Sequence, residues 1–141
     1  MSTESTSEAR LDGRRILIVD DDSDIRSSVE AALRSEGAET ITCSDGNTAV
    51  RLCGEKKPEL VVLDMMLPGR SGFLVLERIK GYEDSPLVIM ITANEGKRHK
   101  VFAEGLGADL YLQKPVGLEI LIDSALELFQ KDEQERESEE R

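Results

Sequence analysis

The feature that most constrains the fold is a series of short, nearly continuous apolar runs at residues 16–19, 60–63, 87–91 and 110–112. Apolar runs that do not alternate with polar residues are typical of strands covered on both faces in a parallel sheet. A weaker, alternating run at residues 39–43 suits an edge strand. We therefore expect a five-stranded parallel sheet.

Helical patterns lie between and after these runs. The first has apolar residues spaced i, i+4, i+7 and i+8, which form one face of a helix: Ile25, Val29, Ala32 and Leu33. Asp22 or Ser23 can cap it, and Gly37 can end it. Further helices are predicted over residues 47–56, 73–80, 97–104 and 118–129. Strand and helix alternate five times, which predicts an α/β fold with right-handed crossovers and helices on both faces of the sheet.

The length of 141 residues suits one compact domain with tails. Residues 1–13 are rich in Ser, Thr and Glu, and we expect a disordered lead-in. Residues 14–129 form the predicted domain. Residues 130–141 are strongly charged, and either extend the last helix or fray as an acidic tail.

Charge limits the choice of partner. The formal net charge of −11 argues against nucleic-acid binding, which needs clustered Lys and Arg, but leaves cations and basic proteins open. No apolar run is long enough to span a bilayer, and the polar N-terminus lacks a signal-peptide core. Cys43 and Cys53 form no metal-binding motif. We expect a cytoplasmic protein with reduced thiols and no membrane partner.

Reactive side chains stand where four of the predicted strands end: Asp20 and Asp21, Asp64, Thr92 and Lys114. Ligands of parallel α/β sheets bind at the carboxyl ends of the strands, so these groups are expected to converge. Two like charges about 4 Å apart cost about 4 kcal/mol at an effective dielectric of about 20, so a bound cation is expected to offset them. Carboxylate oxygens favour Mg²⁺, Mn²⁺ or Ca²⁺.

This set of groups suits phosphoryl transfer. A carboxylate can act as nucleophile, while a metal ion and an ammonium stabilise the charge. Lys114 can pair with a carboxylate at rest and with a phosphoryl oxygen after transfer. The Thr92 hydroxyl can donate a hydrogen bond to another such oxygen.

Four segments, ILIVDDDSD, LVVLDMMLPGRSG, VIMITA and YLQKP, occur in this order. Together they resemble the signature segments of response-regulator receiver domains of two-component systems, of the chemotaxis-regulator kind, over residues 14–129. The resemblance implies a flavodoxin-like, doubly wound sheet of order 2-1-3-4-5. It also implies a protein that catalyses only its own phosphorylation and dephosphorylation and is otherwise not an enzyme.

The resemblance implies a role for each site residue. Asp64 would be the phosphoacceptor, assisted by Lys114. Asp20, Asp21, Asp64 and the backbone carbonyl of Met66 would bind Mg²⁺, with Mn²⁺ as an alternative. The phosphoryl donor would be a phosphohistidine of a sensor histidine kinase or phosphotransfer protein.

The resemblance extends to a conformational switch. Thr92 would be the switch hydroxyl, and Tyr111 the aromatic that moves with it. The bond between Lys114 and Pro115 would be cis. Ser71 is a departure, because Asp is common at its place in the family. Output would pass by contact to a downstream protein effector, from a monomer or weak dimer.

Other interpretations fit less well. Asp64 and Lys114 could form a structural salt bridge only. An EF-hand is excluded because Ile25 and Ala31 replace the required Gly and Glu. An aspartyl-phosphate hydrolase of the haloacid dehalogenase type needs an acid where Met66 stands. A nucleotide-binding module needs a glycine-rich loop where DDDSD stands. A degenerate receiver that serves only for docking would not need every site residue, and all are present.

Overall fold

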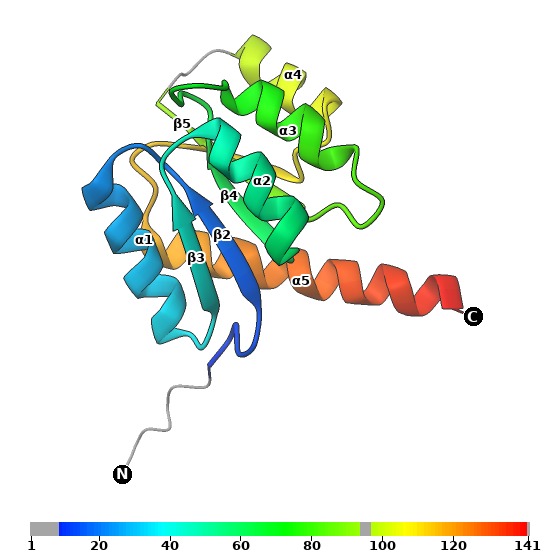
Figure 1. Ribbon diagram of the computed structural model, residues 1–141. Coiled ribbons are helices and arrows are strands. Elements are labelled where there is room, and N and C mark those ends of the chain that lie inside the picture. The colour runs from blue at the N-terminus through cyan, green and yellow to red at the C-terminus, as the bar shows by residue number, and fades with distance from the viewer. Residues whose placement is uncertain (1–8, 94–96, 141) are drawn as a thin grey trace.

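A computed structural model describes residues 9–93 and 97–140 (Figure 1). In this part of the chain, strands and helices alternate in the order β2 (Arg15–Val19), α1 (Ser23–Ser35), β3 (Glu39–Cys43), α2 (Gly46–Lys56), β4 (Leu60–Asp64), α3 (Gly72–Lys80), β5 (Leu87–Thr92), α4 (Lys97–Gly105), β6 (Leu110–Gln113) and α5 (Leu118–Glu140). Apart from the C-terminal end of α5, each predicted element lies within one residue of its observed bounds.

The strands form one parallel sheet in the order β3-β2-β4-β5-β6, which confirms the predicted order 2-1-3-4-5. From β2 the chain passes to the edge strand β3, crosses back to β4 and continues to the opposite edge. The order therefore reverses between β2 and β4, which are hydrogen-bonded neighbours. Their carboxyl ends flank the switch point, where ligands of such sheets bind.

Two apolar layers cover the sheet. On one face, Ile16 and Ile18 of β2 belong to a buried cluster with α1 and α5. On the other face, Leu17 and Val19 belong to a cluster with α2, α3 and α4. Figure 1 shows α2, α3 and α4 together on one side of the strands, and α1 and α5 on the other. Alternate residues of a strand point to opposite faces, so a continuous apolar run supplies both layers.

Side-chain caps fix where helices begin. Asp22 caps α1 by accepting hydrogen bonds from the backbone N–H groups of Asp24 and Ile25, as predicted. Asp45 caps α2, and Ser71 caps α3. The serine at position 71 is therefore accommodated as a helix cap beside the β4–α3 loop.

The N-terminal boundary differs from the prediction. Residues 1–13 were expected to be a disordered lead-in, but residues 9–13 contain a turn, and Leu11 is completely buried in the cluster with α1 and α5. Residues 1–8 lie outside the described part of the chain. The expectation is wrong for residues 9–13, because an apolar side chain that fills the core outweighs the polar composition around it.

Ion pairs hold this turn in place. Arg10 contacts Glu36 at 2.9 Å, Glu119 at 2.9 Å and Asp123 at 3.0 Å. The backbone N–H of Leu11 donates to the carbonyl of Glu36 at 2.9 Å. The turn thus joins the end of α1 to the first half of α5.

The C-terminal segment extends the last helix, which is one of the two predicted alternatives for residues 130–141. Helix α5 continues without a break to Glu140 and projects beyond the sheet in Figure 1. Arg14 forms ion pairs with Glu133 and Glu59, and its guanidinium lies 4.2 Å from the centroid of the Phe129 ring. These contacts tie part of the extension to the domain.

Candidate functional site

Three carboxylates meet at the switch point of the sheet. Asp20 and Asp21 follow β2, and Asp64 is the last residue of β4. One carboxylate oxygen from each lies within 4.8 Å of the others. Asp20 and Asp64 are each only 5% exposed, whereas Asp21 is exposed. The predicted convergence is therefore present in the structure.

Backbone N–H groups orient the carboxylates of Asp20 and Asp64. The N–H of Asp22 donates to Asp20 Oδ1 at 2.9 Å, and the N–H of Met66 donates to Asp64 Oδ1 at 3.1 Å. Gly72 lets α3 approach the acceptor strand, since a Cβ there would lie 2.6 Å from the Asp64 carbonyl oxygen. No sequence pattern assigns a role to this glycine, because the contact depends on how α3 meets β4.

Lys114 bridges the two buried carboxylates. Its Nζ lies 3.0 Å from Asp20 Oδ2 and 3.2 Å from Asp64 Oδ2. Its backbone N–H donates to the carbonyl of Thr92 at 2.8 Å. The bond to Pro115 is cis, as the resemblance implies. The ammonium thus sits between Asp20 and Asp64, although β5 separates β6, which Lys114 follows, from β4, which Asp64 ends.

Burial and neighbouring charges shift the pKa values of both Asp64 and Lys114. Burial raises the pKa of the Asp64 carboxyl, and the negative charge of Asp20 raises it further, while the hydrogen bond from Met66 and the charge of Lys114 oppose the shift. Burial acts to lower the pKa of Lys114, but its hydrogen bonds and charge interactions with Asp20 and Asp64 outweigh that effect and raise it. Lys114 therefore remains an ammonium and compensates part of the carboxylate charge.

Thr92 and Tyr111 occupy the neighbouring strands β5 and β6. Thr92 is fully buried at the end of β5 and points to the same face as Met90, two residues earlier. Met90 pairs with Tyr111 in the sheet, and Tyr111 packs against the α2–α3–α4 cluster. Burial raises the pKa of Tyr111. The two predicted switch residues therefore share one face of the sheet beside α4.

The donor set fits a hard divalent cation. It offers oxygen from Asp20, Asp21 and Asp64, and no sulfur or nitrogen ligand from the described residues belongs to it. Oxygen-only sites suit Mg²⁺, Mn²⁺ or Ca²⁺. Met66 lies in the same loop with its side chain 67% exposed, so its backbone is the part of the residue that faces the site.

An apolar cavity of about 600 Å³ adjoins Lys114. Ile25 and Val29 of α1 form one wall, and Pro115, Val116 and Leu118 form another. The sequence does not reveal this cavity, because its walls come from segments far apart in the chain. The cavity places an apolar surface beside Lys114, which contacts Asp20 and Asp64.

Comparison with known proteins agrees with this geometry. Residues 16–126 match the family described as the response regulator receiver domain. A CheY-like receiver domain protein from Methanospirillum hungatei JF-1 has a TM-score of 0.84 and 30% identity, over 87% of this chain and 98% of that one.

Two further structures extend the comparison. The signal receiver domain of a putative Luxo repressor protein from Vibrio parahaemolyticus has a TM-score of 0.84 and 26% identity, over 90% of this chain and 98% of that one. NtrX from Brucella abortus has a TM-score of 0.84 and 32% identity, over 91% of this chain but only 29% of NtrX. This chain therefore matches less than a third of NtrX.

A doubly wound parallel sheet of this strand order, with three carboxylates and a lysine at its switch point, defines an α/β domain of the flavodoxin-like class. The chain belongs to the response regulator receiver domain family of two-component signalling. Among the described residues, no helix is long and apolar enough to cross a membrane.

Proposed function

We propose that Asp64 accepts a phosphoryl group from a phosphohistidine of a sensor histidine kinase or phosphotransfer protein. An Asp64 carboxylate oxygen attacks phosphorus, the bond from phosphorus to the histidine nitrogen breaks, and the histidine leaves with the electron pair. Water later cleaves the acyl phosphate and releases inorganic phosphate. The supporting observation is the convergence of Asp20, Asp21, Asp64 and Lys114 at one edge of the sheet.

Each remaining group has a role in that transfer. Mg²⁺, or Mn²⁺, bound by Asp20, Asp21, Asp64 and the Met66 carbonyl would supply positive charge for the phosphoryl oxygens. Lys114 exchanges its contact with Asp64 for a phosphoryl oxygen. The chain catalyses only its own phosphorylation and dephosphorylation. A haloacid-dehalogenase-type hydrolase is not favoured, because Met66 provides no acid or base.

The phosphoryl donor would dock on the apolar cavity beside Lys114. Ile25, Val116 and Leu118 give it an apolar surface beside Lys114, which contacts Asp64. The rim of the cavity carries Asp24 and Lys114, which suits a donor surface of mixed charge. Labelling by a small phosphoryl donor tests the acceptor without requiring this contact.

Output would follow from a population shift, in which phosphoryl oxygens favour one arrangement of Thr92 and Tyr111. The signal would leave through α4, β6 and α5, where Val101, Phe102 and Ile120 are more than half exposed. We propose a cytoplasmic protein effector rather than nucleic acid, because the net charge is −11. The chain would act as a monomer or weak dimer.

Metal binding should stabilise the fold. Mg²⁺ offsets the repulsion among the carboxylates, so at ten times Kd it should add about 1.4 kcal/mol to the free energy of unfolding. The corresponding rise in melting temperature is a few degrees, about 3 to 6 °C. Asp21→Ala should remove most of this rise, as measured by calorimetry across a Mg²⁺ series.

Asp24→Ala is the matched control. Asp24 is an exposed residue in the first turn of α1, and it lies outside the carboxylate cluster. It should keep the full Mg²⁺ response. A wild-type melting temperature that does not change with millimolar Mg²⁺ would contradict the metal site.

The switch is tested with Thr92→Ala. This variant should still be phosphorylated, since Asp64 is unchanged, but should lose most of the change in hydrogen exchange around Tyr111 and α4. The measurement compares exchange with and without a beryllofluoride mimic of the phosphoryl group. Thr42→Ala, the same change on the edge strand β3, should respond like wild type. A full response in Thr92→Ala would refute the coupling.

A further inference from the structure

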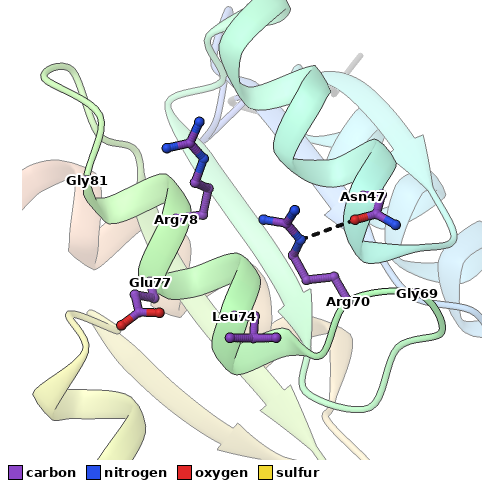
Figure 2. Close-up of a pocket in the computed structure, with 7 residues that line it drawn as sticks. All are labelled: Asn47, Gly69, Arg70, Leu74, Glu77, Arg78 and Gly81. Carbon is purple, nitrogen blue, oxygen red and sulfur yellow. Dashed lines mark hydrogen bonds between the residues drawn. The ribbon is translucent and has the colours of Figure 1, made fainter.

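Two arginine side chains reach into a groove between α2 and α3. The groove has a volume of about 570 Å³ and runs along α3 from the preceding loop to Gly81. Asn47 of α2, Arg70 of the β4–α3 loop and Arg78 of α3 contribute its polar groups. Figure 2 shows the Arg70 and Arg78 side chains extending into the same space between the two helices.

Arg70 is held in position before any ligand binds. Its Nε donates to Asn47 Oδ1 at 3.2 Å, and its backbone N–H donates to the carbonyl of Pro68 at 2.9 Å. The loop also packs closely on α2, since a Cβ at Gly46 would lie 2.2 Å from the Arg70 carbonyl oxygen. The Nη donors of Arg70 bond to none of the described residues, and Figure 2 shows them in the space between the two helices.

No carboxylate of the described residues compensates the positive charge of the groove. Neither Arg70 nor Arg78 forms an ion pair with a carboxylate of the described residues, although the chain carries 29 acidic and 18 basic side chains. Arg78 instead lies with its guanidinium 5.6 Å from the centroid of the Tyr82 ring. Glu77 also lines the groove, but Figure 2 shows its carboxylate directed away from both guanidinium groups.

Among the described residues, Arg26 and Arg34 also lack an ion pair, and what distinguishes Arg70 and Arg78 is that both line one groove. On the neighbouring surface of α2, Arg51 is paired with Glu55 at 3.0 Å. Two guanidinium groups that line one groove repel each other, and an anion bound between them would relieve that repulsion. Guanidinium groups bind phosphate and carboxylate oxygens in a bidentate manner. An anion with two negative charges would balance both arginines.

We propose that this groove binds a small molecule carrying a phosphate group, with Arg70 and Arg78 on its oxygens and the Asn47 amide orienting Arg70. A phosphate monoester carries a charge of about −1.5 to −2 at neutral pH, which matches two guanidinium groups. A monocarboxylate would leave one of them uncompensated. The site is separate from the carboxylate cluster, and its occupancy does not require phosphorylation of Asp64.

Titration of the ¹⁵N-labelled chain tests this. Inorganic phosphate, pyrophosphate and a nucleoside monophosphate are added separately through the millimolar range, without divalent metal so that the carboxylate cluster repels them. Acetate serves as the singly charged comparison. We expect saturable shifts at the amides of Asn47, Gly69, Arg70 and Arg78, weaker for acetate and weakened by salt. Preference among the three phosphates shows whether the ligand is the free anion or an ester.

Variants of Arg70 and Arg78 test whether their guanidinium groups donate hydrogen bonds to the phosphate. Arg70→Gln and Arg78→Gln should each weaken binding about tenfold, the loss expected for one charge-assisted contact. Arg51→Gln is the matched control, because Arg51 is exposed on α2 and already paired, and it should bind like wild type. Unchanged melting temperatures would show that all three variants fold. Shifts that do not saturate, or equal affinity in the double variant of Arg70 and Arg78, would overturn the proposal.

Discussion

Asp64→Asn should abolish phosphorylation of this chain. Wild type incubated with a small phosphoryl donor and Mg²⁺ should gain one phosphoryl group, which hydroxylamine removes as it does from acyl phosphates. Asparagine has nearly the same shape as aspartate but lacks the carboxylate that attacks phosphorus. Intact-mass spectrometry should therefore detect the modification in wild type and none in the variant.

Asp84→Asn is the control, because Asp84 is exposed in the loop between α3 and β5, and the same chemical change there should leave labelling unchanged. Asp64→Asn should remain folded, since removing one charge from a crowded carboxylate cluster relieves repulsion. Continued labelling of a folded Asp64→Asn protein would mean that another carboxylate is the acceptor.

The sheet and its site could be predicted because their determinants are local in the sequence. A continuous run such as residues 60–63 specifies a strand buried on both faces, and the residue after it must stand at the carboxyl edge. Asp64 and Lys114 are far apart in sequence, yet parallel strand order alone brings their strand ends to one edge. Their contact at 3.2 Å agrees with that reasoning.

Other features depend on contacts that no local pattern encodes. The groove that Arg70 and Arg78 share depends on how α2 and α3 lie relative to each other, and the spacing of the arginines in the sequence does not reveal it. Similarly, the charged segment after Phe129 has no apolar stripe that would favour a helix, and it is helical as a continuation of the packed part of α5. Helix propagation costs less than nucleation, so a nucleated helix extends into residues that would not start one.

The folded turn at residues 9–13 could not be predicted from the sequence for the same reason. One leucine among polar residues has no periodicity, and its burial depends on a space that only the folded domain creates. Leu11 is fully buried in the cluster that contains Leu33, Ala38 and Phe129. The turn is therefore part of the core even though the family match begins only at residue 16.

Leu11→Ala should accordingly destabilise the domain by about 2 to 5 kcal/mol, the range for a leucine-to-alanine change at a buried site. The loss combines the transfer free energy of the removed methyl groups with the cavity that remains between α1 and α5. The lower end of the range applies if the turn relaxes into that cavity. Urea unfolding should show a lower midpoint with an unchanged slope, because the variant exposes nearly the same surface on unfolding.

Leu74→Ala is the matched control, since it deletes the same atoms from a side chain that is 54% exposed. It should change the free energy of unfolding by less than about 0.5 kcal/mol. Hydrogen exchange adds a local measure, because the N–H of Leu11 donates to Glu36 and the N–H of Gly13 donates to Gly37 in wild type. Loss of the turn in Leu11→Ala should speed exchange at both amides. Equal stabilities of the two leucine variants would show that the turn does not contribute to the core.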